Sequence, residues 1–305
     1  MGLQATHGLY FVGLGSTLLG GITRQNLGIE SEIKGEPQSG EVFRRFLAMY
    51  SQKVAPGFST TSIAAALTAC GALGASLADM TGGLALYAQK QADGATRASG
   101  SAHKKFAMVK GILAPKQLSV DHRGDATLEY DAVVTWDGTN DPVQITDSAP
   151  LPAAIADAGR WTLGPTVIGG KTLMGKRQWQ INFGIEVVPE SADSEIWDRI
   201  ASIHAIQSTM TLRGVDVDWF KSSNIPLAGL ACTHANTGIY LRKRATASTF
   251  ASDGSPVHLL FNVAGLASVQ RIEATEKAPA ECAITLPIYW DGSNANIAMN
   301  LASAI

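Results

Sequence analysis

The chain has few charged residues and no strong excess of either sign. Lysine, arginine, aspartate and glutamate make up 16% of its 305 residues, and the formal net charge is −2. Typical soluble domains carry roughly 25% charged residues. A nucleic-acid-binding protein needs a basic surface to neutralise phosphates. The composition therefore argues against direct DNA binding, and it suits a protein whose surface is largely in contact with other protein.

Cysteines and long apolar runs are also scarce. The three cysteines, at positions 70, 232 and 282, are far apart and form no C-x-x-C pair. Neither a disulfide framework nor a thiolate zinc site is expected, and we predict three buried thiols. The apolar stretch 9–22 is shorter than the roughly 20 residues that a membrane span needs. It is interpreted as a strand and a turn, and no membrane association is predicted.

Common catalytic and cofactor motifs are absent as well. The glycine-rich segment 13–18 fails the G-x-G-x-x-G pattern because Leu18 takes the place of the third glycine. The chain has no phosphate-binding loop, H-E-x-x-H pair or G-x-S-x-G turn, and no aspartates at calcium-loop spacing. We predict no enzymatic activity, no cofactor and no metal. A Ser/His/Asp site assembled in space stays open, because six histidines are scattered along the chain.

The sequence does contain an internal repeat. Trp136-Asp137-Gly138-Thr139-Asn140 recurs as Trp290-Asp291-Gly292-Ser293-Asn294, 154 residues later. Four other matches are collinear with it, and a looser one links residues 100–103 with 254–258. The four are residues 41–43 with 195–197, 15–20 with 170–175, 28–30 with 184–186, and 86–90 with 239–243. Shifts that vary by only three residues predict a duplication in which each copy is a complete domain with its own core.

The repeat predicts domains at residues 1–150 and 151–305, with a linker at about 147–160 that is rich in proline and small residues. Apolar and polar residues alternate along 126–136 and along its counterpart 282–290, as in strands with one buried face. Both segments end in an Asp-Gly turn. Residues 178–187 and 257–263 show the same alternation. The predicted fold is mainly β with a few helices, as two tandem β-sandwich or barrel domains related by duplication.

Two helices are expected in the first copy. Residues 41–52 place apolar side chains at helical spacing, and 194–204 is the matching segment in the second copy. Residues 60–70 form an alanine-rich candidate with Ser59 or Thr60 as N-cap. Sheet edges expose N–H and C=O groups that can recruit another chain, so we expect them to be the joints of an assembling subunit.

Basic residues gather in equivalent places of the two copies. Those in the segment 89–110, and those after residue 241, are candidate subunit-interface residues that reach a neighbour through long loops, although such runs are usually only solvated surface. The candidates are Lys90, Arg97, His103, Lys104, Lys105, Arg242, Lys243 and Arg244. His103 and His258 occupy matching positions, which predicts a shared place in the fold.

Three further segments carry a resemblance to a known family. They are Gly57-Phe58-Ser59-Thr60-Thr61 before the alanine-rich helix, 100–103 before 111–115, and 126–130 running to 136–140. These segments give the chain a resemblance to the major tail proteins that build the tail tubes of long-tailed bacteriophages. It implies domains that are β-sandwiches with a flanking helix. It also implies that sheets of neighbouring subunits join into a barrel around a lumen, while long hairpins or loops bridge to the next ring.

The resemblance further implies a virion protein that assembles with itself in the bacterial host cytoplasm. Rings of that family present six domains, so three copies of a two-domain chain would complete a pseudo-sixfold ring. Stacked rings would conduct DNA during ejection without specific binding, through a lumen that tends to be acidic. Other expected partners are the tape measure, baseplate and tail terminator proteins. Two alternatives stay open: a baseplate hub or distal tail protein that forms one ring, and a carbohydrate-binding or hydrolytic virion protein.

Overall fold

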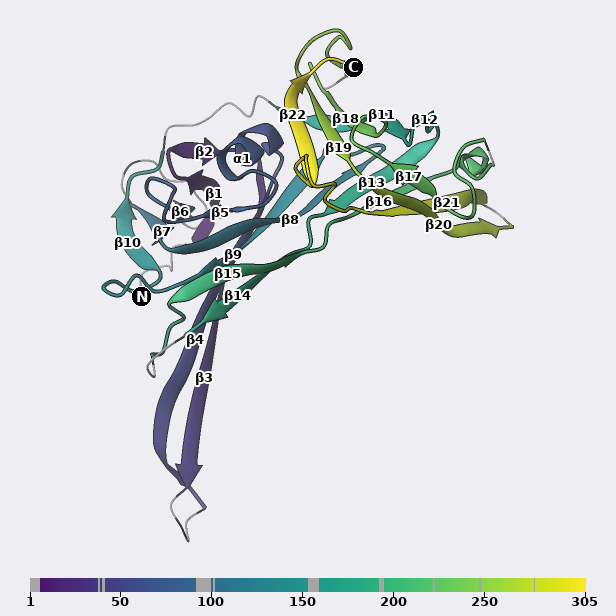
Figure 1. Ribbon diagram of the computed structural model, residues 1–305. Coiled ribbons are helices and arrows are strands. Elements are labelled where there is room, and N and C mark those ends of the chain that lie inside the picture. The colour runs from purple at the N-terminus through teal and green to yellow at the C-terminus, as the bar shows by residue number, and fades with distance from the viewer. Residues whose placement is uncertain are drawn as a thin grey trace.

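A computed structural model describes residues 6–37, 39, 42–91, 100, 102–152, 159–191, 195–221, 223–246, 248–276 and 278–305. The protein is mainly β, with several antiparallel sheets and one α-helix in the described part of the chain. Figure 1 shows two lobes that share a long sheet, and a two-stranded arm that projects away from them.

The elements of the first half are β1 (Thr6–Leu14), β2 (Thr17–Leu19), β3 (Ile22–Pro37), β4 (Arg44–Thr60), α1 (Ile63–Cys70), β5 (Ala75–Ser76), β6 (Leu84–Gln91), β7 (His103–Met108), β8 (Gly111–Asp121), β9 (Thr127–Val134) and β10 (Gln144–Ala149). Those of the second half are β11 (Trp161–Ile168), β12 (Lys171–Thr172), β13 (Lys176–Asn182), β14 (Ile185–Glu190), β15 (Ile200–Ile206), β16 (Thr209–Gly214), the 3-10 turn η1 (Val217–Trp219), β17 (Leu230–Cys232), β18 (Gly238–Lys243), β19 (His258–Val263), β20 (Gly265–Thr275), β21 (Ala278–Pro287) and β22 (Ile297–Ser303).

The strands form two layers. Each half contributes one five-stranded sheet, in the orders β10-β7-β6-β1-β2 and β12-β11-β18-β19-β22. A third sheet runs through both halves in the order β17-β20-β21-β16-β13-β8-β9-β4-β3, with β5 paired to β8. Across the two layers, the rings of Trp179 on β13 and Phe261 on β19 lie 5.5 Å apart. Apolar side chains on facing sheets thus build a sandwich-like core.

The strand pairings within the two halves correspond, and the single long β3·β4 ladder is matched by two shorter ones. Each ladder of the first half has a counterpart in the second half. The matches are β1·β2 with β11·β12, β1·β6 with β11·β18, β6·β7 with β18·β19, and β7·β10 with β19·β22. The others are β3·β4 with β13·β16 and β14·β15, β4·β9 with β16·β21, β8·β9 with β20·β21, and β5·β8 with β17·β20. Irregularities also correspond: β8 shifts register after Pro115, and β20 shifts after Val269.

The registers correct two of the sequence matches. Gly28 pairs with Ala55 and Asn182 pairs with Thr209, so Gly28 corresponds to Asn182 and not to Gly184. The glycine turn of residues 15–20 is likewise displaced by one residue, because Leu14↔Thr17 corresponds to Ile168↔Lys171. Short glycine-containing motifs tolerate such slips, whereas ladder pairing fixes every residue.

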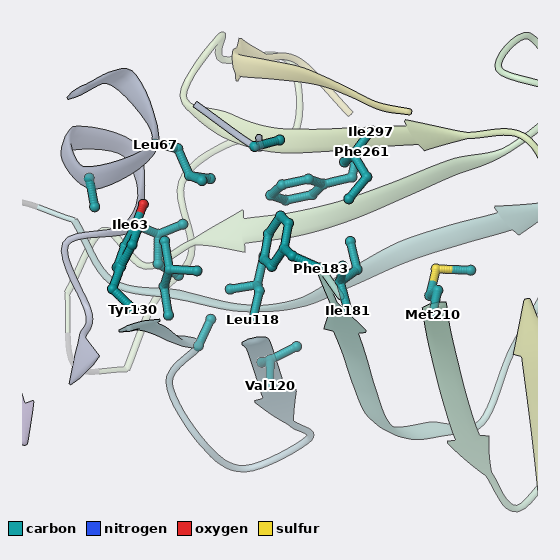
Figure 2. Close-up of a cluster of buried hydrophobic side chains, with 14 of the residues drawn as sticks. Ile63, Leu67, Leu118, Val120, Tyr130, Ile181, Phe183, Met210, Phe261 and Ile297 are labelled. Carbon is teal, nitrogen blue, oxygen red and sulfur yellow. The ribbon is translucent and has the colours of Figure 1, made fainter. Parts of the chain in front are cut away.

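The buried apolar side chains of both halves form one contiguous cluster. In Figure 2, Leu118 of the first half lies near Phe183 and Phe261 of the second, while Tyr130 lies beside Ile63, below α1. The expectation of a separate core in each half is therefore wrong. Because the long sheet continues from one half into the other, its apolar face is also continuous.

The expected helix at residues 41–52 is wrong. Residues 44–52 lie in β4, which pairs with β3 along almost its whole length. Residue 41 lies outside the described residues. The matching segment 194–204 is not helical either: residues 200–204 lie in β15, and 194 lies outside the described residues. Apolar spacing can suggest a helix face, but ladder hydrogen bonds from a partner strand override that local pattern.

The other expected helix is confirmed, with a later start. α1 begins at Ile63 with Ser62 as N-cap, whereas Ser59 and Thr60 still belong to β4. The strands expected around 126–136, 257–263 and 282–290 are confirmed as β9, β19 and β21, although β21 already ends at Pro287. The strand and turn at 9–22 are confirmed as well. β10 ends at Ala149 and β11 begins at Trp161, while residues 153–158 of the expected linker lie outside the described part.

One expected strand is in fact two. Residues 178–187 divide at Gly184, which has φ +58° and separates β13 from β14. A Cβ at this position would lie 2.1 Å from the Gln207 carbonyl oxygen. Only glycine fits such a left-handed, crowded position without strain. Here the β14–β15 hairpin leaves the plane of the long sheet.

The three cysteines are free and buried, as predicted. Burial raises the pKa of the Cys70 thiol to about 12 and that of Cys282 to about 11. It also raises the pKa of Cys232. These thiols stay protonated at neutral pH, and they behave as small core residues.

Candidate functional site

The two halves are joined edge to edge by β8 and β13. Five antiparallel residue pairs run from Gln117↔Asn182 to Asp121↔Gln178. Within this ladder, Leu118 lies opposite Ile181, and both side chains are fully buried. Backbone hydrogen bonds extend the ladder at both ends: Phe183 N–H donates to Lys116 O at 3.0 Å, and His122 N–H donates to Arg177 O at 2.7 Å. This internal joint makes one sheet out of two.

Charged groups reinforce the joint beside the ladder. Arg160 Nη1 lies 3.2 Å from Asp125 Oδ2, and Arg244 Nε donates to Asp125 Oδ1 at 2.9 Å. The Arg244–Asp125 pair is partly buried on both sides. Ala126 N–H also donates to Trp161 O at 2.7 Å. These contacts fix the orientation of the halves, and the partly buried pair is screened less by salt than the exposed one.

The counterparts of the two joined strands are open edges. β20 corresponds to β8. On the side of β20 that faces away from β21, the described chain supplies only β17, which pairs with residues 265–267 of β20. The first part of β3 corresponds to β13 and lies at the other end of the sheet. Ile272, the counterpart of the fully buried Leu118, is 50% exposed. Two long edges with apolar side chains are thus available to another chain.

The β14–β15 hairpin crosses onto the first half. Gln52 N–H donates to Ile196 O at 2.7 Å, and Trp136 N–H donates to Asp198 O at 2.7 Å. The Trp197 indole N–H donates to the Gln52 side-chain oxygen at 2.9 Å. The rings of Trp136 and Trp197 lie 5.8 Å apart. Figure 1 shows this hairpin, hereafter the second arm, running below β8 and β9 to reach β4.

The corresponding hairpin of the first half, residues 29–53 of β3 and β4, is the first arm. Within the described chain it projects without a partner segment at its tip (Figure 1), and Val42 and Phe43 are 92% and 82% exposed. Trp290, the counterpart of Trp136, is 66% exposed. Exposed apolar clusters of this kind mark protein–protein contact surfaces.

The face of the long sheet that points away from the core is polar and of mixed charge. Ser119 and Thr127 share a hydrogen bond of 3.2 Å between their hydroxyl groups. Lys116 Nζ lies 2.8 Å from Asp131 Oδ2. Arg177 Nη1 lies 2.9 Å from Glu281 Oε1. The cations on this face are therefore partly neutralised by neighbouring carboxylates.

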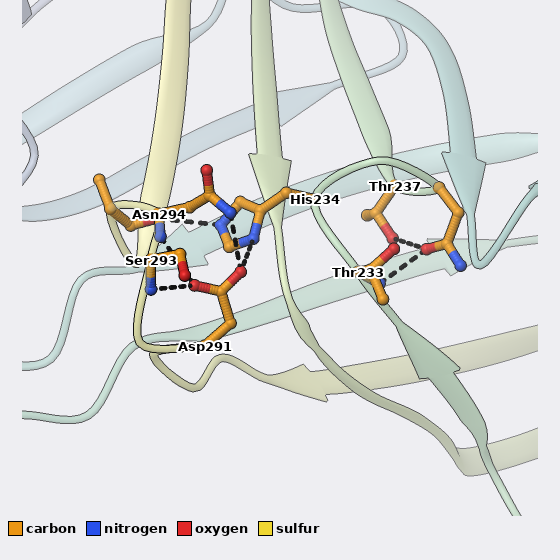
Figure 3. Close-up of polar contacts among 8 residues, drawn as sticks. Thr233, His234, Thr237, Asp291, Ser293 and Asn294 are labelled. Atoms are coloured by element: carbon orange, nitrogen blue, oxygen red, sulfur yellow. Dashed lines mark hydrogen bonds and ion pairs between the residues drawn. The ribbon is translucent and has the colours of Figure 1, made fainter.

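One histidine–aspartate pair has the composition of a catalytic dyad (Figure 3). His234 Nδ1 lies 3.1 Å from Asp291 Oδ2, but its Nε2 lies 2.9 Å from the Ala295 carbonyl oxygen. Both ring nitrogens are occupied by acceptors, so neither is free to act as a base on a substrate. Asp291 also accepts hydrogen bonds from Ser293 N and Asn294 N, which hold its pKa well below the usual range.

The first half contains the same turn without a histidine. Asp137 accepts from Thr139 N, Asn140 N and Asn140 Nδ2, which lower its pKa to about 2. The Asp291 cluster is therefore a turn motif. The described residues contain no group of three or more His, Cys, Asp or Glu side chains that could hold a metal ion.

The structure places most of the predicted basic interface residues on paired strands with partners in the same chain. Lys104 pairs with Asp147 at 2.7 Å, and Arg242 with Asp253 at 2.7 Å. Lys105 lies over the Tyr87 ring. Arg244 serves the internal joint, and Lys90 and Lys243 lie at the ends of β6 and β18. Arg97 lies outside the described residues.

His103 is fully buried, as is His258. Each ring accepts a hydrogen bond at Nδ1 from a backbone N–H, that of Lys90 or Lys243 respectively, at 3.0 Å. The predicted shared fold position of these histidines is confirmed. A buried ring in a single chain makes no surface contact, so its role here is to hold neighbouring strands together.

Comparison of the chain with protein-family models and with curated protein sequences finds no match. Among the described residues, no helix has the length and hydrophobicity that crossing a bilayer requires. Sequence reasoning expected sheet edges to act as joints, but it did not identify the edge residues Ile272 on β20 and Leu27 on β3, the counterpart of Ile181. It also missed Phe43 and Trp290, although the repeat matches at 43/197 and 136/290 contained that signal.

Proposed function

We propose that this chain is a structural, non-enzymatic subunit that joins head to tail with copies of itself. β20 of one copy pairs with β3 of the next, as β8 pairs with β13 inside each copy. The observation that carries this proposal is the internal joint: one chain already contains the contact, and it also carries both unpaired counterparts. We further infer that the halves are duplicated modules, because their ladders and irregularities correspond.

A head-to-tail contact between unlike edges is heterologous, so repetition closes into a ring or continues as a filament. With two modules in each chain, three chains supply the six modules of a pseudo-sixfold ring. Combined with the resemblance to tail tube proteins, this supports a role as the tail tube subunit of a long-tailed bacteriophage, whose stacked rings conduct DNA during ejection. We propose that the polar face of the long sheet lines the lumen, where paired charges limit adhesion of DNA phosphates.

The test is electron microscopy combined with sedimentation velocity on the purified chain. The expected result is rings of three copies, stacked into tubes at high concentration. Single rings that never stack would favour the baseplate hub or distal tail alternative. A chain that stays monomeric at high concentration would overturn the proposal.

A further inference from the structure

We propose that the tip of the first arm docks on a second copy of this chain, with Phe43 packed against Trp290 and Val42 beside Ile206 of that copy. This inference rests on the proposed head-to-tail assembly and adds a second contact to it. The occupant is identified by the internal contact of the second arm, which places counterparts of all four residues together within one chain.

The correspondence is specific for each residue. Trp197 of the second arm lies against Trp136, and Ile196 accepts a hydrogen bond from the backbone of Gln52. A shift of 154 residues along the ladders maps Phe43 to Trp197 and Trp290 to Trp136. The same shift maps Val42 to Ile196 and Gln52 to Ile206. The segment at the first tip reads Glu-Val-Phe-Arg-Arg and that at the second reads Glu-Ile-Trp-Asp-Arg. Both tips thus carry a β-branched residue followed by an aromatic ring.

Burial separates the satisfied contact from the open one. Trp136 and Trp197 are half-buried within the chain, whereas Phe43 is 82% and Trp290 is 66% exposed. Two aromatic rings left in water, at positions where equivalent rings pack together, indicate a contact that only a neighbour can complete. The proposed edge contact identifies the same neighbour. The copy whose β3 pairs with the open β20 also brings its first arm to the chain that carries this β20.

The arms leave their sheets differently, and this sets a condition on docking. The second arm turns at Gly184, whereas the first has Glu30 at the matching position and continues straight from β3 (Figure 1). Docking therefore requires the first arm to bend on assembly. Gly28, two residues earlier, has no Cβ and can adopt backbone angles closed to other residues.

Two cysteine pairs test the contact in the assembled protein. Leu27→Cys with Ile272→Cys probes the edge, because the counterparts Ile181 and Leu118 lie directly opposite each other. Phe43→Cys with Trp290→Cys probes the arm, using a short bis-maleimide. We expect chain-to-chain cross-links from both pairs and none from single-cysteine variants. An edge cross-link without an arm cross-link would overturn this inference alone, and loss of both would overturn the head-to-tail assembly as well.

A matched substitution separates this contact from a general effect of the arm. Phe43→Ala should raise the concentration needed for assembly at least tenfold. Phe46→Ala should change it less than twofold, because Ile200, the counterpart of Phe46, stays 60% exposed in the internal contact. Equal effects of the two substitutions, or none from Phe43→Ala, would refute docking of the tip on Trp290.

Discussion

Leu118 and Ile272 occupy matching positions in the two halves. We predict that alanine at Leu118 lowers the stability of the monomer, whereas alanine at Ile272 weakens assembly. Leu118 is fully buried in the internal joint, so its truncation removes core packing from every monomer. Such changes cost about 2–5 kcal/mol. With a shift of about 2–4 °C per kcal/mol for chains of this size class, Tm should fall by roughly 4–20 °C.

Ile272→Ala should leave the monomer almost unchanged, because half of the side chain is already exposed. Its cost should appear on assembly. Burying the remaining half of an isoleucine contributes about 1 kcal/mol, which corresponds to roughly a fivefold weaker contact at each joint. Three joints in a ring multiply this to about a hundredfold.

The assays are thermal unfolding under dilute, monomeric conditions and sedimentation velocity over a range of concentrations. Leu118→Ala should change the first and Ile272→Ala the second. The reasoning is refuted if Ile272→Ala lowers the Tm of the monomer as much as Leu118→Ala does. It is also refuted if Ile272→Ala assembles at the same concentration as the unchanged protein.

Three further predictions concern the chain itself. Asp137 has a folded-state pKa of about 2, below its usual value, so its stabilising contribution is present above pH ~4 and lost as pH falls towards 2. Asp137→Asn should therefore flatten the dependence of Tm on pH in this window. An unchanged slope would contradict the assignment. Gly184→Ala should destabilise the chain by about 1 kcal/mol or more, because the added Cβ meets the Gln207 carbonyl oxygen. Gly254→Ala should not destabilise it, because no atom lies within 4 Å of a Cβ at that position. Equal denaturation midpoints of the two variants would contradict this. A thiol reagent should label no cysteine in the native protein and all three after unfolding; rapid native labelling would contradict their burial.

Local patterns in the sequence were sufficient where one segment determines its own structure. Alternating apolar residues predicted β9 and β19, and the Asp-Gly pairs predicted turns in which Asp137 and Asp291 cap the following backbone N–H groups. Alanine-rich composition predicted α1. These features depend on interactions within a few residues, so they can be predicted without knowledge of the rest of the chain.

Contacts between segments far apart in the sequence decided features that local patterns did not predict. Residues 44–52 have helical apolar spacing, but β3 supplies a partner strand along their length, and the segment becomes half of an arm. The structure also gives several of the basic residues partners within the chain, such as Asp125 for Arg244, which no local pattern predicted. Neither outcome is encoded in spacing alone, because both depend on residues far apart in the sequence.

By itself the sequence predicted a chain dominated by strands, with motifs that recur at a shift near 154 residues, buried cysteines and turns at fixed places. Only the tertiary structure decided which edges meet. β8 and β13 meet inside the chain, whereas their counterparts β20 and β3 stay open. Hydrogen bonding between strands is a property of two segments together, so single-segment patterns leave it undetermined.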